Sequence, residues 1–319
     1  MQHHIYTLML GGELYTAPIG ANPQRILDIG TGTGIWAIDM ADKFPSAEII
    51  ATDLSVIQPQ WVPPNLRFEI DDCELDWTYM SKFDYIHIRS MSGSIGDWAI
   101  LMEKAYDNLH PGGWIELMDF ETEATTDDHS VPSDSAWTQY QTNVNEAASR
   151  FGKVMNAAPH YKGYVLDAGF ANVTEFIHKV SGALLSEMVV LKGQVPFSPW
   201  PSDARGKELG RWMVPQMLAS VEPYALALLS RVLKWNNTEI QVLLAGVRND
   251  IRNVNYHLYS KVYVPLLIPF GVRTTGLHPL RRQLFTVQQT CRIWAEALRL
   301  ILSVCSGVGA GVWAAFEQS

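Results

Sequence analysis

Cysteine and charge, above all positive charge, are scarce in this sequence. The 319 residues include three cysteines, Cys73, Cys291 and Cys305, which are too few and too scattered for a disulfide framework or a zinc cluster. We therefore expect a reducing compartment, cytoplasmic or nuclear, and no metal site. Against 24 lysines and arginines stand 33 acidic residues, which gives a net charge of −9. This balance argues against direct nucleic-acid binding, which depends on a basic surface.

We also expect no signal peptide, because no basic stretch precedes a long apolar run in the first residues. Apolar residues, in contrast, make up 47% of the chain, so a sizeable core can be buried and general disorder is excluded. The length suits one large α/β domain or two ordinary domains.

Short apolar runs alternate with helical patterns between residues 20 and 120, which predicts a parallel sheet covered by helices on both faces. We expect strands at 25–29, 48–52, 66–70, 83–88, 114–118, 172–179 and 256–264. We expect helices at 35–44, 98–109, 133–151, 161–168, 203–234 and 238–252. Pro111-Gly-Gly113 is expected to break the chain before the fifth strand, and Thr238-x-x-Gln241 has the pattern of a capping box.

The segment with the most specific chemistry is a glycine-rich turn between a predicted strand and a predicted helix. Gly30, Gly32 and Gly34 alternate with other residues directly after the first strand. Glycine allows positive φ and close approach of a ligand, and the following helix presents unpaired N–H groups. Asp53 ends the next strand, where its carboxylate can accept hydrogen bonds from two ribose hydroxyls. The pattern predicts a site for a nucleotide-like cofactor.

Three interpretations of this turn are open: a nicotinamide or flavin site, an S-adenosylmethionine site, and a turn that only packs a strand against a helix. Gly32-x-Gly34-x-x-Ala37 also fits the dinucleotide fingerprint. Asp28 favours S-adenosylmethionine, because a carboxylate at this place would repel a pyrophosphate. It would suit a ligand that carries an ammonium and a sulfonium.

Further stretches carry a resemblance to a known family. They are Gln2–Tyr6, Leu14–Ile19, Ile26–Ala37, Ala51–Ser55, Asp71–Glu74, Ile88–Ile95 with Asp97-Trp98, and His110–Glu116. With them the chain resembles the class I S-adenosylmethionine-dependent methyltransferases, and more narrowly the LaeA-like methyltransferases of filamentous fungi. The resemblance spans roughly residues 2–180 and 196–264. It implies a seven-stranded Rossmann-like α/β fold whose sheet is mostly parallel and whose last strand is antiparallel.

The resemblance also implies which residues bind the cofactor, S-adenosyl-L-methionine. The glycine turn with Asp28 would hold the methionine part, and Asp53 the ribose. Asp72 and the backbone of Cys73 would meet the adenine amine. The complete implied set is Asp28, Gly30, Gly32, Gly34, Asp53, Leu54, Asp72, Cys73 and Arg89.

Two members of this set have structural alternatives. Arg89, at the end of the fourth strand, would hold the cofactor carboxylate with two parallel hydrogen bonds, or else form a structural ion pair with Asp28 or Glu116. Asp72 follows Asp71, and the two could equally form a solvated acidic turn.

Catalytic residues remain unknown from the sequence. By resemblance, His3, His4, Tyr6 and Tyr15 would form a lid over the cofactor, and either histidine could act as a general base. Frayed histidines without a function are the alternative. His87, in the middle of a predicted strand, is expected to be a hydrogen-bonded core histidine.

The segment after the sixth strand is where such folds build the cover of the substrate site. Its large apolar residues either pack in a helical core or line a pocket for an apolar small molecule: Trp200, Trp212, Met213, Met217 and Tyr224. The expected function is methyl transfer to a small molecule in fungal secondary metabolism. The alternative is a nuclear regulator of secondary-metabolite genes that works through protein partners and has little or no turnover.

We expect a lid at 1–19 and a methyltransferase domain at 20–264, which contains an atypical insert at 181–195. The insert has no recognisable counterpart in the family and is interpreted as translated intron. Residues 265–319 form an atypical tail that carries five arginines and two acidic residues, which reverses the charge of the preceding chain. Contact with a membrane is expected only if this tail is native.

Overall fold

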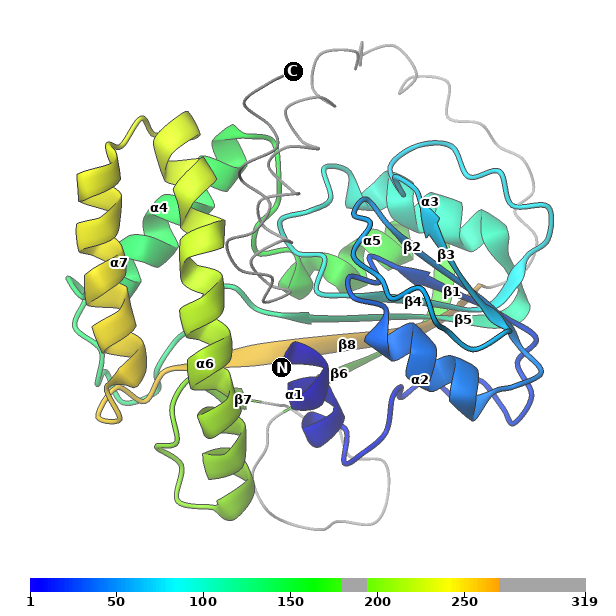
Figure 1. Ribbon diagram of the computed structural model, residues 1–319, viewed down its shortest axis with the longest axis horizontal. Coiled ribbons are helices and arrows are strands. Elements are labelled where there is room, and N and C mark those ends of the chain that lie inside the picture. The colour runs from blue at the N-terminus through cyan, green and yellow to red at the C-terminus, as the bar shows by residue number, and fades with distance from the viewer. Residues whose placement is uncertain (179–193, 270–319) are drawn as a thin grey trace.

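The computed structural model describes residues 1–178 and 194–269, and its centre is one mixed β-sheet (Figure 1). The strand order is β3-β2-β1-β4-β5-β8-β6, and the short β7 pairs with β8. The strands from β3 to β5 in this order are parallel, whereas β8 is antiparallel to both β5 and β6. The predicted Rossmann-like fold is confirmed. The strands are β1 Arg25–Ile29, β2 Glu48–Asp53, β3 Leu66–Ile70, β4 Phe83–Arg89, β5 Leu109–Phe120, β6 Phe170–His178, β7 Gln194–Pro196 and β8 Tyr259–Pro269.

Helices cover both faces of the sheet, and three of them form a bundle beside it (Figure 1). One face packs against α1 and α2, and the other against α3 and α5. The bundle consists of α4, α6 and α7, which contact one another. The helices are α1 Gln2–Met9, α2 Ile35–Lys43, α3 Trp98–Asn108, α4 Ala136–Arg150, α5 Tyr161–Asp167, α6 Ala204–Ala227 and α7 Asn237–Arg252.

Burial on both faces explains why the central strands are continuous apolar runs. In β1, Ile26 packs in the cluster that contains Trp36 of α2, whereas Leu27 packs in the cluster that contains Trp98 of α3. Successive side chains of a strand point to opposite faces, so both faces need an apolar partner. The carboxyl ends of β1, β2 and β4 meet at one edge of this layer, where the glycine turn lies.

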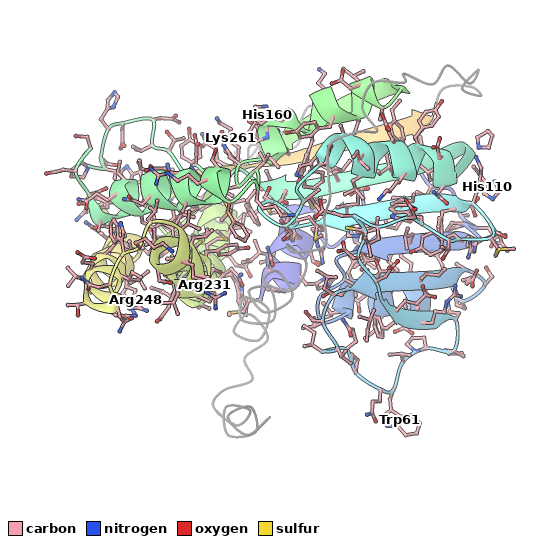
Figure 2. The ribbon with its side chains drawn as sticks, turned by 90° about the horizontal axis from the view of Figure 1, so that it is seen from above. Trp61, His110, His160, Arg231, Arg248 and Lys261 are labelled. Carbon is pink, nitrogen blue, oxygen red and sulfur yellow. The ribbon has the colours of Figure 1, made fainter. Side chains whose placement is uncertain are left out.

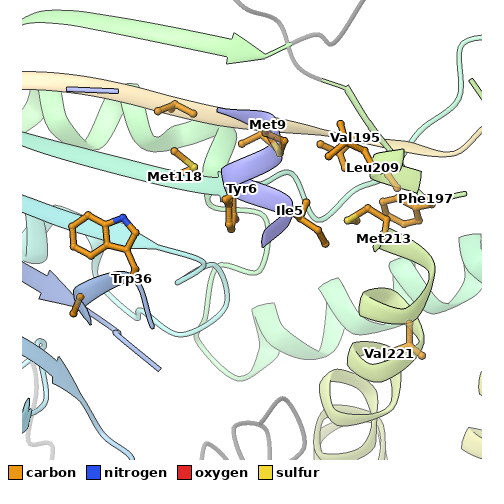
Figure 3. Packing of buried hydrophobic residues seen from close by; sticks show 14 of the residues in the cluster. Ile5, Tyr6, Met9, Trp36, Met118, Val195, Phe197, Leu209, Met213 and Val221 are labelled. Carbon is orange, nitrogen blue, oxygen red and sulfur yellow. The ribbon is translucent and has the colours of Figure 1, made fainter. Parts of the chain in front are cut away.

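Helix α1 is the main element that the sequence patterns missed. It packs with Ile5, Tyr6 and Met9 against the large core cluster, and all three are buried. Figure 3 shows this face of α1 beside the start of α6, near Leu209 and Met213. The N-terminal segment is therefore part of the folded layer.

Several element boundaries differ from those predicted. Strand β5 begins at Leu109, because Pro111-Gly-Gly113 forms an irregularity within the pairing with β4 and does not end the strand. Strand β8 starts three residues later and ends five residues later than expected. The capping box of α7 is built by Asn236 and Glu239, two residues before the predicted pair.

Two predicted features lie largely outside the described residues: the insert, of which only residues 194 and 195 are described, and the tail beyond residue 269. Among the helices that the structure describes, none has the length and apolar character needed to cross a membrane. Figure 2 shows the exposed loop between β2 and β3, with Trp61 pointing away from the body of the protein.

Replacing Asn236 with alanine should lower the free energy of unfolding by about 1 kcal/mol. The Asn236 side chain accepts the Glu239 N–H at 3.0 Å, and Glu239 accepts the Asn236 N–H at 2.8 Å. Urea denaturation measures the change. The control is Thr238→Ala, an exposed position in the same turn, for which we expect a loss below about 0.5 kcal/mol. Equal losses in the two variants would contradict the assignment of the cap.

Candidate cofactor site

The glycine turn after β1 is tied to the end of β2. The Gly30 and Thr31 N–H groups both donate to the Thr52 carbonyl, each at 2.9 Å. All three glycines have positive φ, with values of 71° at Gly30, 60° at Gly32 and 80° at Gly34. A Cβ at Gly32 would meet no atom within 4 Å. The middle of the turn therefore presents open backbone to a ligand.

At Gly30 and Gly34, close packing also favours glycine. A Cβ on Gly30 would collide with the Met91 side chain, and a Cβ on Gly34 would collide with the ring of Phe68. Gly34 is also the N-cap residue of α2. These positions exclude larger side chains, whereas Gly32 is open, so the turn both packs the sheet and forms a cradle.

Asp53 fixes the turn from the side of β2. Its Oδ2 accepts the Gly32 N–H at 2.8 Å, and its Oδ1 accepts the Ser55 N–H at 2.9 Å. Burial raises the pKa of this carboxyl above its ordinary value. A carboxylate offers about four acceptor positions, so two remain for the hydroxyls of a ligand. Leu54, the next residue, is 39% exposed at the same edge.

Asp28 is buried beneath the turn and paired with His87 of β4. Asp28 Oδ1 lies 2.7 Å from His87 Nδ1, and the two residues are register partners in the sheet. The His87 ring stacks on Trp36 with centroids 3.6 Å apart and planes at 8°. The prediction of a core histidine is confirmed for its burial. The predicted hydrogen bonding is confirmed for Nδ1, which contacts Asp28, but not for the buried Nε2, which has no partner among the described residues.

Arg89 ends β4 next to the turn and is partly buried. Its Nη2 donates to His3 Nδ1 at 3.2 Å, and its guanidinium lies 4.8 Å from the ring centroid of Tyr6. Among the described contacts Arg89 has no ion pair with Asp28 or Glu116, so the structural ion pair considered from the sequence is wrong for this structure. A partly buried guanidinium without a carboxylate partner fits an anionic ligand.

Helix α1 lies against this end of β4. The Gln2 amide donates to Ser90 Oγ at 2.7 Å, and the Tyr6 hydroxyl lies 2.9 Å from the same oxygen. His3 has Arg89 at one ring nitrogen and Asp39 Oδ2 at the other, 2.9 Å away. Burial and the charge of Arg89 lower the pKa of His3. Both nitrogens of His3 are engaged, which favours a structural role over a general base.

The other two predicted lid residues lie elsewhere. His4 contacts Trp212 of α6, with ring centroids 4.5 Å apart. Tyr15 packs beside Phe44 and under Lys43, at the end of α2 that is far from the glycine turn. Tyr15 is therefore not part of the lid side of the site.

Buried Glu116 anchors the chain that follows α1. Its carboxylate accepts the backbone N–H groups of Thr16 at 3.0 Å and Ala17 at 2.8 Å, and the Tyr85 hydroxyl at 3.0 Å. Close by, the Trp36 indole donates to the Leu14 carbonyl at 2.8 Å. These bonds hold the connection between α1 and β1 on the sheet.

Asp72 and Cys73 lie on the turn after β3. Asp72 Oδ1 accepts the Glu74 N–H at 2.9 Å, and the Cys73 carbonyl accepts the Trp77 indole N–H at 3.0 Å. The Asp71 N–H donates to the Asp53 carbonyl at 3.2 Å, which brings this turn to the edge of the site. Burial and the neighbouring acidic groups raise the pKa of the Cys73 thiol to about 12.

Asp119, at the carboxyl end of β5, is a residue that the sequence patterns missed. Its Oδ2 accepts the Ser92 N–H at 2.7 Å and the Tyr161 hydroxyl at 3.0 Å. Burial raises the pKa of Asp119 to about 6. Asp119 holds the loop after β4, which also carries Met91 against the glycine turn. The sequence pattern that could have identified Asp119 is an acidic residue at the end of an apolar run of strand length.

The residues of the proposed substrate cover lie on and before α6. Met213 is buried in the core, which agrees with helical packing, whereas Trp212 is 37% exposed and faces His4. Trp200 precedes the helix and donates to the Leu258 carbonyl at 3.1 Å. Arg205 joins α6 to α1 through the carbonyls of Leu8 and Met9, both at 2.9 Å.

These observations fit S-adenosylmethionine. The turn has one open glycine, a carboxylate on each side, and the Arg89 guanidinium, which has no carboxylate partner among the described residues. A sheet of this order with such a turn at its carboxyl edge defines a Rossmann-like methyltransferase.

Residues 1–175 match the family model described as a methyltransferase domain, and the chain belongs to this family. Methyltransferase pytC of Aspergillus terreus is 37% identical over 272 residues, 85% of this chain and 79% of pytC. The secondary metabolism regulator LAE1 of Cochliobolus heterostrophus is 34% identical over 269 residues, 82% of this chain and 83% of LAE1. The solved structure of Haemonchus contortus phosphoethanolamine N-methyltransferase 2 with S-adenosyl-L-methionine aligns with a TM-score of 0.44 and 15% identity, over 84% of this chain and 56% of that one.

Relative to the wild type, Asp119→Asn should gain about 1–3 kcal/mol in free energy of unfolding between pH 4 and pH 7.5. The pKa of about 6 in the folded state exceeds the value of about 4 for an unfolded carboxyl, so the folded protein binds this proton more tightly. The stability that comes from the neutral acid is complete below pH 4 and is lost as the pH rises through 6, whereas the variant cannot ionise. A constant loss is expected on top of this change, because both carboxylate oxygens accept backbone N–H groups, from Ser92 at 2.7 Å and Phe120 at 2.9 Å, and asparagine has one acceptor oxygen.

Urea denaturation at pH 4, 5, 6 and 7.5 tests this dependence. If the difference in free energy of unfolding between the variant and the wild type stayed constant over this pH range, Asp119 would ionise normally in the folded state.

Proposed function

We propose that this protein transfers a methyl group from S-adenosylmethionine to an oxygen, nitrogen or sulfur atom of a small molecule of fungal secondary metabolism. The observation that carries the proposal is the charge pattern around the glycine turn. Asp28 and Arg89 lie on neighbouring strands, next to open backbone at Gly32. A carboxylate and a guanidinium on neighbouring strands complement the ammonium and the carboxylate of a methionine moiety. Asp53 adds acceptors for the ribose hydroxyls.

The protein's part in such a reaction is mainly geometric. When bound, the cofactor supplies an activated methyl donor, and alignment with the acceptor and exclusion of water supply most of the acceleration. Within the proposed lid segment, residues 1–19, helix α1 would cover the site, because it joins the end of β4 to α6, whereas Tyr15 packs away from the site. This arrangement needs no nucleophile and base pair.

The similarity to LAE1 favours one further candidate, a regulator of secondary metabolism that acts through protein partners. Both candidates share the cofactor site, so cofactor binding does not separate them. Turnover separates the two candidates. In a screen of small-molecule acceptors with labelled S-adenosylmethionine, formation of a methylated product would support the enzyme. A protein that binds S-adenosylmethionine but forms no methylated product with any acceptor would support the regulator.

We also propose the domain division 1–19, 20–264 and 265–319, with 181–195 as an insert of intron origin. Sequencing the cDNA across the insert tests it. A native transcript that contains all 45 bases would refute the intron origin.

Asp53→Ala should weaken binding of S-adenosylmethionine and of S-adenosylhomocysteine by about 1–3 kcal/mol, because hydrogen bonds to a charged acceptor are lost. Isothermal titration calorimetry measures both affinities. The matched control is Asp107→Ala, the same change at an exposed position on α3, which should bind as the wild type does.

Unchanged affinity in Asp53→Ala would mean that Asp53 has been assigned wrongly. A folded wild-type protein that binds neither ligand at high micromolar concentration would refute the proposed function itself.

A further inference from the structure

His87 is buried at a cost that simple packing does not explain. It is 1% exposed, and its Nε2 is a buried polar atom without a partner among the described residues. Leaving such an atom unpaired destabilises the fold. An apolar side chain would fill the same space without this cost, which directs attention to the other ring nitrogen, Nδ1.

The orientation of Nδ1 is fixed by two contacts. The ring lies flat on Trp36, with centroids 3.6 Å apart, and Trp36 is itself held by its 2.8 Å bond to the Leu14 carbonyl. In the sheet His87 is the register partner of Asp28, so Nδ1 meets Asp28 Oδ1 at 2.7 Å. The stack and the register together leave the ring little freedom to turn.

Because of this contact, the two oxygens of the Asp28 carboxylate have different surroundings. Oδ1 is held by His87, whereas Oδ2 has no hydrogen-bond partner among the described residues. Asp28 is only 3% exposed, and it lies two residues before the glycine turn. A buried carboxylate with one free oxygen beside a ligand cradle is suited to a cationic group of that ligand.

We propose that His87 is a positioning residue: it holds one oxygen of Asp28 so that the other receives the ammonium of the cofactor's methionine moiety. The inference rests on the proposed function. A hydrogen bond donated from Nδ1 to Oδ1 orients the carboxylate. A lysine or arginine at this position would place a fixed positive charge beside Asp28 and compete with the ammonium of the ligand. Arg89, two residues farther along β4, then remains for the carboxylate of the same moiety.

The test compares two ligands that differ in this moiety. S-adenosylhomocysteine carries the ammonium, whereas 5′-methylthioadenosine has the same nucleoside without the amino-acid end. His87→Phe keeps a flat ring on Trp36 and removes Nδ1. It should weaken binding of S-adenosylhomocysteine roughly 10- to 100-fold and leave the affinity for methylthioadenosine within about twofold. His87→Asn, whose amide nitrogen can replace Nδ1, should restore most of the loss.

Calorimetry on the full chain separates the outcomes. Equal losses for both ligands, or no loss for S-adenosylhomocysteine, would overturn the positioning role. In an Asp28→Asn background, His87→Phe should cause no further loss, and an additive loss would also overturn it. If His87→Phe does not fold, His87→Leu takes its place. A wild-type protein that binds neither ligand would instead refute the proposed function.

Discussion

The hydrogen bonds between the turn after β1 and the end of β2 determine the form of the site. Two backbone N–H groups share the Thr52 carbonyl, and Gly32 donates to Asp53. These bonds force the turn into a positive-φ conformation that glycine adopts without strain. They also place the Asp53 carboxylate in direct contact with Gly32, whose backbone is open. The shape of the cradle and the position of its acid therefore have a common cause.

The N-terminal segment depends on the same layer. Buried Glu116 holds its backbone on the sheet, and α1 then reaches both Ser90 at the site and Arg205 of α6. One eight-residue helix thus links the cofactor edge to the helical bundle (Figure 3). Isolated helices of this length are marginal in water, so α1 owes its stability to these tertiary contacts. Such an element is well placed to couple cofactor binding to the enclosure of an acceptor.

The strands that form the central sheet could be predicted because burial on both faces leaves an apolar run in the sequence. Strands β1 and β3 begin and end at the predicted residues. Helix α1 could not be predicted from the sequence, because its eight residues are too few to show a clear helical period of apolar residues. The pairing of Asp28 with His87 depends on the register of two strands 59 positions apart, and Asp119 meets Ser92 and Tyr161 only in the folded chain. Sequence patterns identified the acids and the glycines, whereas their partners follow from tertiary structure.

We propose that the glycine turn holds S-adenosylmethionine between Asp28 and Asp53, with Arg89 beside it. A crystal structure of the protein with S-adenosylhomocysteine would show whether it does. We expect the ribose hydroxyls within hydrogen-bond distance of Asp53, the ammonium on Asp28 and the carboxylate on Arg89. A ligand bound elsewhere, or bound at the turn with its amino-acid end directed away from Asp28 and Arg89, would contradict it.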